Sequence, residues 1–404
     1  MMAHPAYDLS PSLGLLVLAA LLSLGPLLWL VVRNRGSAPS AARRLQSLRL
    51  LTLFLTFDLV LFGAFTRLTD SGLGCPDWPG CYGNTTPLGA VQPIEQAQQH
   101  MPSGPVTHQK AWIEMVHRYL AMMVGALIVC QSVAGAWTWR RASAPERAQL
   151  LAPAWGWAAL VWVCVQGAFG AWTVTLKLMP AIVTLHLLGA LGLLALLGWS
   201  VALGAQRLAV SAEPGAQVDA RRTGLGRWAL TGTAGLLLVQ IALGGWVSTN
   251  YAVLACQAFP SCQGQWWPDM NFAQGFTLWR PLGVMPSGEP LQFAALTAIH
   301  MAHRIMALLV LLVLFALAWR LWACPVRGHL ARALAALAAL QAVTGVSNVV
   351  LAWPLVAALL HTGGAAALVG VLTALMATRS PAAQPRAADF GAARVRTPDG
   401  RGLV

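Results

Sequence analysis

Nine long apolar runs decide what this chain can fold into. A helix of about 20 residues crosses a hydrocarbon core of about 30 Å, and these runs are too long and uncharged for the strands of a β-barrel. Only 10% of the 404 residues are charged, against roughly 25% in a soluble domain. The sequence therefore predicts an all-α polytopic membrane protein. The predicted spans are residues 13–32, 50–68, 112–139, 152–175, 180–203, 228–249, 296–322, 331–351 and 354–378.

The basic residues predict how these helices are oriented. A formal net charge of +13 could indicate a nucleic-acid-binding protein. However, 20 of the 26 Lys and Arg residues fall in alternate connections and in the tail, which marks the cytoplasmic side of a membrane protein. We therefore expect no nucleic-acid partner, a surrounding lipid bilayer, an outward-facing N-terminus and a cytoplasmic C-terminus. The six basic residues elsewhere are Arg67, Lys110, Arg118, Lys177, Arg280 and Arg304.

Much of the chain is an internal duplication. Two outward connections are long, and we call them the first lid (residues 69–111) and the second lid (residues 250–295). Each lid carries two cysteines six residues apart, and each is followed by a His-Arg pair. Both copies begin on the same side of the membrane, so the repeats are parallel. The matching positions are Cys75 and Cys256, Cys81 and Cys262 (offset 181), His117 and His303 (offset 186), and Gln166 and Gln341, His186 and His361 (offset 175).

The duplication divides the chain into parts. Residues 50–203 and 228–378 are expected to form two pseudo-symmetric four-helix halves, joined by a cytoplasmic linker at 204–227. Residues 1–49 hold an extra transmembrane helix and a cytoplasmic loop, and residues 379–404 form a tail expected to be disordered. The first helix has no basic segment before it and no small-residue cleavage site after it, so we interpret it as a retained helix rather than a secretory signal. Its role is open.

Four histidines lie within the predicted spans at one depth. Each is about six residues inside the outer end of its helix, which is roughly 9 Å. Two imidazoles facing each other across a four-helix bundle can bind a haem iron from both sides. Hydrogen bonding between helices is the alternative, and zinc fits less well because no third protein ligand accompanies each pair. The predicted pairs are His117 with His186, and His303 with His361.

One acidic residue distinguishes the two halves. Glu114 lies three residues before His117, on the same helix face, while His300 takes the equivalent place in the second half. A carboxyl group at this depth is costly, so it indicates function by default. We expect the first half to act on a bound porphyrin, with Glu114 in proton transfer or charge stabilisation, and the second half to hold a permanent haem. A hydrogen-bonded interface carboxylate is the alternative.

These motifs together resemble the haem A synthase family, in its proteobacterial form. The resemblance covers residues 50 to 378, and the extra first helix departs from the family's eight-helix pattern. The motifs are GAFTRLT (63–69), SGL (71–73), EMVHR (114–118), TLH (184–186), HR (303–304) and LHTGG (360–364), with WWPDMNF (266–272) and GFTLWR (275–280) in the second lid.

The resemblance implies an oxidoreductase that acts on a CH group. In this family the C8 methyl of haem O is converted to the formyl group of haem A by successive hydroxylations, for cytochrome oxidase assembly. Carried over, His303 and His361 ligate a resident haem b, His117 and His186 flank the substrate haem, and Glu114 is the catalytic carboxylate. The resemblance also implies a bacterial inner membrane, haem O synthase and an electron-transfer protein as partners, and compatibility with a homo-oligomer.

The lid cysteines face the oxidising side of the membrane. Disulfides Cys75–Cys81 and Cys256–Cys262 are therefore expected. They either pin the lids or, in the first lid, take part in redox chemistry or in handling the incoming haem.

Three arginines lie near the outer helix ends, close to the level of the histidines. Arg67, Arg118 and Arg304 are candidates for contacts with haem propionates, with snorkelling to the interface as the alternative.

Two other functions would use the same histidines. A b-type cytochrome that only transfers electrons needs paired histidines, but it does not need Glu114 in one half or two large lids. A haem carrier or exporter would bind haem transiently and perform no chemistry on it.

Overall fold

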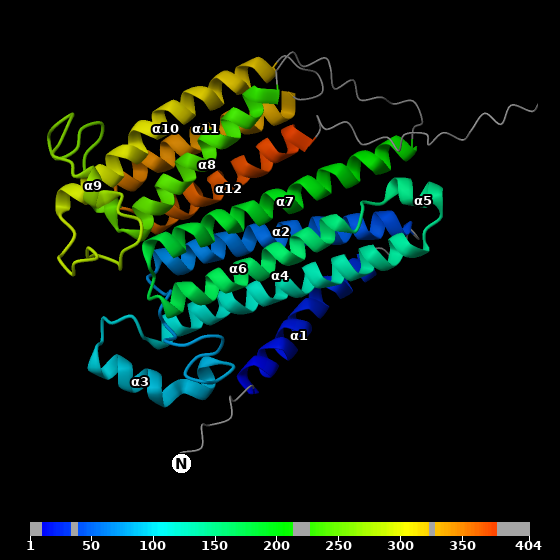
Figure 1. Ribbon diagram of the computed structural model, residues 1–404, viewed down its shortest axis with the longest axis horizontal. Coiled ribbons are helices and arrows are strands. Elements are labelled where there is room, and N and C mark those ends of the chain that lie inside the picture. The colour runs from blue at the N-terminus through cyan, green and yellow to red at the C-terminus, as the bar shows by residue number, and fades with distance from the viewer. Residues whose placement is uncertain (1–9, 34–38, 213–226, 323–327, 378–404) are drawn as a thin grey trace, which may run out of the picture.

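The computed structural model describes residues 10–33, 39–212, 227–322 and 328–377. In this part of the chain, all nine predicted spans are helices long and apolar enough to cross a membrane. The predicted tail, residues 213–226 of the predicted linker and Cys324 lie outside the described residues. The nine helices in Figure 1 are α1 (Ser10–Arg33), α2 (Ala41–Leu68), α4 (His108–Arg141), α6 (Ala154–Thr175), α7 (Pro180–Ala212), α8 (Arg227–Thr249), α10 (Phe293–Trp322), α11 (Gly328–Val350) and α12 (Leu355–Ala377).

Two of these helices extend nine residues beyond their predicted apolar runs. α2 begins at Ala41, where Ser40 caps it by accepting a hydrogen bond from the N–H of Arg43 (3.4 Å). α7 continues to Ala212. An apolar run marks only the part of a helix that lies in hydrocarbon, so polar turns beyond it stay helical without a hydropathy signal. The predicted boundaries at residues 49 and 203 therefore fall inside helices.

The helices pack in two closed rings. In the first half α2 packs on α4, α4 on α6, α6 on α7, and α7 returns to α2. In the second half α8, α10, α11 and α12 follow the same order, and α12 returns to α8. The rings meet where α7 contacts α8 and α12, and where α12 contacts α2. Figure 1 shows the second ring, in green to red, lying alongside the first, in blue to green.

The duplication is also visible in the backbone. Non-glycine residues with positive φ recur at the offsets found in the sequence, and this conformation is rare enough for the repetition to be informative. A tight pairing of Cys81 with Asn84 is likewise matched by Cys262 with Gln265. The matched residues with positive φ are Asp70 and Tyr251, Tyr82 and Gln263, Lys177 and Ala352, and Leu178 and Trp353.

The extra helix α1 packs chiefly along α4, outside both rings. Leu15 and Ala19 are buried, and Leu15 joins an apolar cluster with Ile94 of the first lid and Met115 of α4. The Ser23 hydroxyl, also buried, donates to the carbonyl oxygen of Ala19 (2.7 Å). Figure 1 shows the N-terminal end of α1 beside the segment that holds α3. The helix therefore supports the first lid from one side.

Both lids lie at one end of the molecule, which we call the lid end. The first contains the helices η1 (Pro87–Ala90) and α3 (Val91–His100), and the second contains η3 (Ala252–Ala255) and α9 (Phe272–Gly275). At the opposite end the short helix α5 (Ala144–Gln149) connects α4 to α6. Both predicted disulfides are present, with S–S distances of 2.08 Å for Cys75–Cys81 and 1.99 Å for Cys256–Cys262.

Candidate functional site

Each of the four histidines lies against a glycine of a neighbouring helix. A Cβ added to Gly63 of α2 would stand 2.9 Å from the Cε1 atom of His117 on α4, and one on Gly244 of α8 would stand 2.9 Å from that of His303 on α10. The other pair of contacts is longer but equally repeated. A Cβ added to Gly170 of α6 would stand 3.4 Å from the Cε1 atom of His186, and one added to Gly345 of α11 would stand 3.4 Å from that of His361. Backbone glycine thus leaves room for every imidazole.

The second half brings its two imidazoles close together, with their ring planes nearly perpendicular. The ring centres of His303 and His361 are 6.4 Å apart, with an angle of 79° between the ring planes. Histidine nitrogen binds a metal at about 2 Å, so two imidazoles on opposite sides of one metal ion have ring centres roughly 6 Å apart. The observed separation therefore fits axial ligation of one haem iron.

Both imidazoles of this pair have a polar partner at Nδ1. The Thr344 hydroxyl donates to the carbonyl oxygen of Leu340 (2.6 Å), so it accepts from Nδ1–H of His361 (2.9 Å). The Gln240 amide nitrogen lies 3.0 Å from Nδ1 of His303 and 3.5 Å from Nε2, and the amide oxygen is buried without a hydrogen-bond partner among the described residues. A 180° rotation of this amide would let the oxygen accept from Nδ1–H. This tautomer leaves Nε2 free for a metal, and such support is typical of metal-binding histidine.

The first half holds its imidazoles differently. The Nδ1 atoms of His117 and His186 are buried and have no hydrogen-bond partner among the described residues. Leu59 and Phe169 occupy the positions equivalent to Gln240 and Thr344. The ring of Phe62 instead lies parallel to the His117 ring, with centres 6.4 Å apart. Among the described residues, only the second half therefore fixes the orientation of its imidazoles through Nδ1.

A repeated amide anchors one histidine of each pair. Gln166 of α6 donates to the carbonyl oxygen of His186 (3.0 Å), and Gln341 of α11 donates to that of His361 (2.9 Å). Gly189 and Gly364 make room for these amides, since a Cβ at either position would lie 2.6 Å or 2.3 Å from the amide nitrogen. The sequence carried a signal for this contact, because both glutamines precede their histidine by 20 residues.

Glu114 is buried and bound to the first lid. One carboxylate oxygen accepts from the backbone N–H of Cys75 (2.8 Å), and the other accepts from Arg118 (2.5 Å). Only 3% of Glu114 is exposed. The close approach of the lid depends on Gly74, where a Cβ would stand 2.4 Å from the carbonyl carbon of Lys110. The carboxylate therefore lies on the histidine face of α4 and also directly under the disulfide loop.

Arg118 holds the same loop through three carbonyl oxygens. Its guanidinium donates to Asp77 (3.0 Å), Pro79 (3.2 Å) and Gly80 (2.5 Å). Arg118 is thus an anchor of the first lid, and contact with a propionate remains a prediction for it.

The second lid is anchored in a parallel way. Arg304 donates to the carbonyl oxygens of Cys256, Ala258 and Ser261, at 3.0–3.4 Å. His300, in place of Glu114, donates from Nδ1 to the carbonyl oxygen of Ala252 (2.9 Å). The propionate contact predicted for Arg304 likewise remains a prediction.

Arg67 joins the two halves at the lid end. Its guanidinium donates to the carbonyl oxygen of Ser248 (2.5 Å), pairs with Asp70 (3.1 Å) and lies 4.2 Å from the ring centre of Tyr251. The Tyr251 hydroxyl in turn donates to Asp70 (2.6 Å). Arg67 and Ser248, and Asp70 and Tyr251, are equivalent positions of the repeat, so this clasp lies on the axis that relates the halves. Burial raises the pKa of Tyr251, and the bond to Asp70 adds to this effect while Arg67 opposes it.

Sequence reasoning missed several of these contacts. Single polar residues such as Gln240 and Thr344 have no periodicity that distinguishes them within an apolar helix. Across the described ranges, no group of three or more His, Cys, Asp or Glu side chains forms a metal site.

Comparisons with known proteins identify the family of this chain. A profile of the COX15-CtaA family of cytochrome oxidase assembly proteins matches residues 46–373, which excludes α1. The chain is similar to the heme A synthase of Shewanella oneidensis, with 38% identity over 331 residues that cover 80% of this chain and 93% of the relative. The heme A synthase of Hyphomonas neptunium is 26% identical over 363 residues, covering 84% of this chain and 93% of that relative. The chain therefore belongs to the COX15-CtaA family of cytochrome oxidase assembly proteins.

Proposed function

We propose that this protein is a haem A synthase that oxidises the C8 methyl of haem O to the formyl group of haem A. Family membership and the heme A synthases among its relatives support the reaction. We interpret the two rings of helices as a substrate half and a cofactor half. The observation that carries this division is that only the second pair of histidines has partners at Nδ1. A permanent ligand needs a fixed tautomer and ring orientation, whereas a substrate site must bind and release.

His303 and His361 would hold the resident haem b in the second half. Bound there, haem b supplies a one-electron carrier next to the substrate half. Thr344 keeps the proton of His361 on Nδ1, and Gln240 is placed to do the same for His303. Gln341 fixes the backbone of His361 from α11.

In the first half His117 and His186 would flank haem O, with Glu114 as the catalytic carboxylate. Glu114 would take up, at its carboxylate oxygens, a proton released as the methyl group is oxidised. The carboxylate is held in place by Arg118 and by the N–H of Cys75. The first lid, pinned by its disulfide and by these two contacts, would close the site from the outside.

A test requires a host that lacks its own haem A synthase but makes haem O. Membranes from cells expressing this protein should accumulate haem A, and the purified protein should contain haem b. Glu114→Ala should abolish haem A while haem b stays bound. Haem b without any haem A in the membranes would instead favour an electron-transfer cytochrome or a haem carrier. Loss of all haem from Glu114→Ala would make Glu114 a structural residue.

Single histidine substitutions test the division of the halves. His361→Ala should remove the resident haem b from the purified protein. His117→Ala should leave that haem in place and stop turnover of haem O. If both variants lost the same fraction of haem b, the two pairs would be equivalent and the division would be wrong.

The proposal also covers the membrane that holds the protein, its orientation and its partners. We place the protein in a bacterial inner membrane, with both lids and the N-terminus in the periplasm and the C-terminus in the cytoplasm. Haem O synthase would deliver the substrate, an electron-transfer protein would accept the electrons removed from the methyl carbon, and a homo-oligomer is compatible with this arrangement. Reporter fusions at the lids and at the C-terminus test the orientation, which a cytoplasmic signal from either lid would contradict.

A further inference from the structure

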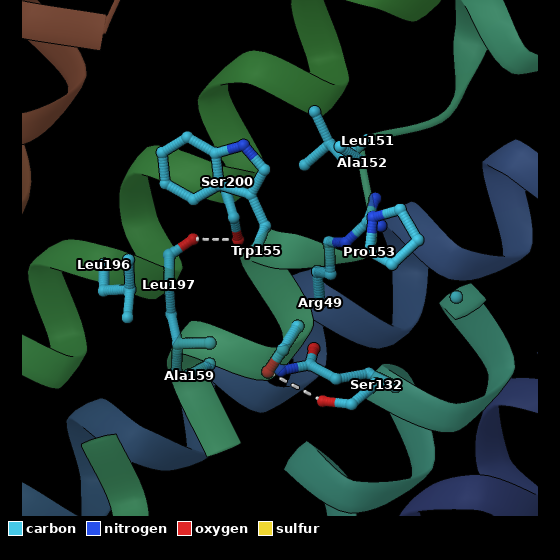
Figure 2. A pocket seen from close by; sticks show the side chains of 13 residues that line it. Arg49, Ser132, Leu151, Ala152, Pro153, Trp155, Ala159, Leu196, Leu197 and Ser200 are labelled. Atoms are coloured by element: carbon cyan, nitrogen blue, oxygen red, sulfur yellow. Dashed lines mark hydrogen bonds between the residues drawn. The ribbon is translucent and has the colours of Figure 1, made fainter. Parts of the chain in front are cut away.

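A small polar cavity lies in the first half, at the end opposite the lids. Its volume is about 20 Å³, and all four helices of the ring contribute to its walls. Figure 2 shows Arg49 from α2, Ser132 from α4, Trp155 from α6 and Ser200 from α7 around it, with Pro153 at the start of α6. Gln131 of α4 also lines the cavity.

The polar groups of this cavity are incompletely paired. No carboxylate pairs with Arg49 anywhere in the part of the chain that the structure describes. Gln131 is only 6% exposed, and its side-chain oxygen has no hydrogen-bond partner among the described residues. A 180° rotation of this amide would place its NH2 group, a hydrogen-bond donor, at the position of the unpaired oxygen. Helix α6 begins there at Ala154 without a side-chain cap, so its first N–H groups add a partial positive charge. The cavity thus combines a full positive charge with hydrogen-bond donors, and it lacks an anion.

The repeat supplies an internal control for this cavity. The positions equivalent to Arg49, Gln131, Ser132, Gly156 and Ser200 carry apolar residues in the second half, each at most 4% exposed. These residues belong to the main apolar core of the protein. The same arrangement of four helices can therefore fill this space with apolar side chains, as the second half does, whereas the first half leaves a polar cavity. The replacements are Arg49 by Leu230, Gln131 by Leu317, Ser132 by Ala318, Gly156 by Ala331 and Ser200 by Leu375.

The position of the cavity fits the headgroup layer of the bilayer. Arg49 lies 19 residues before Leu68 at the lid end of α2, a distance of about 29 Å along the helix. Gln131 lies 14 residues beyond His117 on α4, about 21 Å further from the lids. A hydrocarbon core is about 30 Å thick, so the cavity lies near the membrane face opposite the lids. Basic pockets between helices at that face bind anionic lipid headgroups.

We propose that this cavity binds an anionic phosphate group, held by Arg49, Gln131 and the start of α6. The guanidinium provides the charge and the paired donors that phosphate oxygens accept. The amide of Gln131 and the N–H groups at the start of α6 complete the site. The phosphate comes either from an anionic lipid of the surrounding leaflet or from solution. This site is independent of the haem sites, and the proposal does not rest on the proposed function.

The test uses the full-length protein in nanodiscs of phosphatidylglycerol, phosphatidylcholine or a mixture of the two. Native mass spectrometry counts retained lipids, and thermal unfolding is followed in each membrane with and without inorganic phosphate. Arg49→Gln removes the charge. Gln131→Leu introduces the residue that the second half carries, so this variant is expected to fold even if Arg49→Gln does not. Arg43→Gln is the control, because Arg43 is an exposed arginine of the same helix.

The wild-type protein should retain phosphatidylglycerol in preference to phosphatidylcholine, or should be stabilised by inorganic phosphate. The first result identifies a lipid and the second a soluble anion. Arg49→Gln should weaken the binding about tenfold or more, as expected for loss of a charged hydrogen bond. Gln131→Leu should weaken it as well, and Arg43→Gln should bind as the wild type does. No response of the wild type to either source would overturn the proposal, and so would an equal loss in Arg43→Gln.

Discussion

Replacing Glu114 by Gln should loosen the first lid and leave the second lid unchanged. The carboxylate accepts from the N–H of Cys75 and from Arg118, and both bonds are buried. Glutamine keeps the shape and one acceptor oxygen, but it removes the charge and leaves Arg118 without its anionic partner. Arg118 would still donate to three lid carbonyl oxygens, which limits the cost.

The expected magnitude follows from these contacts. A hydrogen bond to a charged group contributes about 1.5–3 kcal/mol, and removing one partner of a buried ion pair costs roughly 3–5 kcal/mol when nothing else compensates. Since three carbonyl contacts remain, we expect a loss of about 2–3 kcal/mol in the free energy of lid opening. That corresponds to roughly 30- to 150-fold more frequent opening.

Hydrogen–deuterium exchange of the backbone amides measures this opening directly. Peptides covering residues 71–85 should exchange faster in Glu114→Gln, while those covering residues 252–265 should not change. His300→Gln is the matched control, because it breaks a neutral hydrogen bond to Ala252 in the second lid. A neutral bond contributes about 0.5–1.5 kcal/mol, so its effect should be smaller and confined to the second lid. Unchanged exchange in the first lid, or equal changes in both lids, would refute this reasoning.

Three further substitutions test other contacts. Thr344→Val removes the acceptor for Nδ1–H of His361, and it should weaken haem b binding about 10- to 100-fold in a haem-transfer assay; unchanged retention would remove Thr344 from the haem site. Burial raises the pKa of the Tyr251 phenol above its usual value of 10.0. The unfolded chain therefore loses this proton first, and the stabilisation is present below pH 10 and lost as the pH rises above it. Tyr251→Phe should abolish that loss in thermal unfolding curves, and an unaltered pH profile would exclude the phenol as its source. Gly14→Leu should increase proteolysis within the first lid, because a Cβ there would meet the Thr85 hydroxyl at 2.6 Å; cleavage at the wild-type rate would show that α1 does not support the lid.

The fold could be predicted largely because the membrane simplifies the problem. Crossing hydrocarbon requires long apolar helices, so each crossing leaves a readable run of residues. The same reasoning fails at helix ends. The first turns of α2 and the last turns of α7 are polar or weakly apolar, and they remain helical because caps and neighbouring helices support them.

The histidines and lid cysteines could be found because duplication marks them twice. The partners of individual side chains could not. Arg118 and Arg304 carry long side chains whose direction depends on the fold of the lids, and in the structure both bind lid carbonyl oxygens. Likewise, the sequence shows that Gln240 takes the place of Leu59 in the second half, but only the structure shows that Gln240 contacts His303.

Divergence between the halves is concentrated at three levels along the membrane normal. At the lid end, the first half carries Glu114 where the second half carries His300. At the level of the imidazoles, the second half alone supplies partners for Nδ1, through Gln240 and Thr344. At the opposite end, Arg49 lines a polar cavity that leucine fills in the second half.

At the first two levels, by contrast, the halves share their backbone features and anchors, from the positive-φ residues of the lid turns to the glutamine bound to the backbone of His186 or His361. On the proposed division of the halves, backbone geometry would set where a porphyrin fits, and a few side chains would set whether it stays. A single change at an Nδ1 partner can therefore shift a half from retaining haem toward exchanging it without altering the helices. On this basis we expect Leu59→Gln with Phe169→Thr, which copies the second half's partners into the first, to convert the substrate site into one that retains haem. Purified protein should then carry up to twice the haem per chain and form less haem A, and an unchanged haem content would show that the Nδ1 partners do not decide retention.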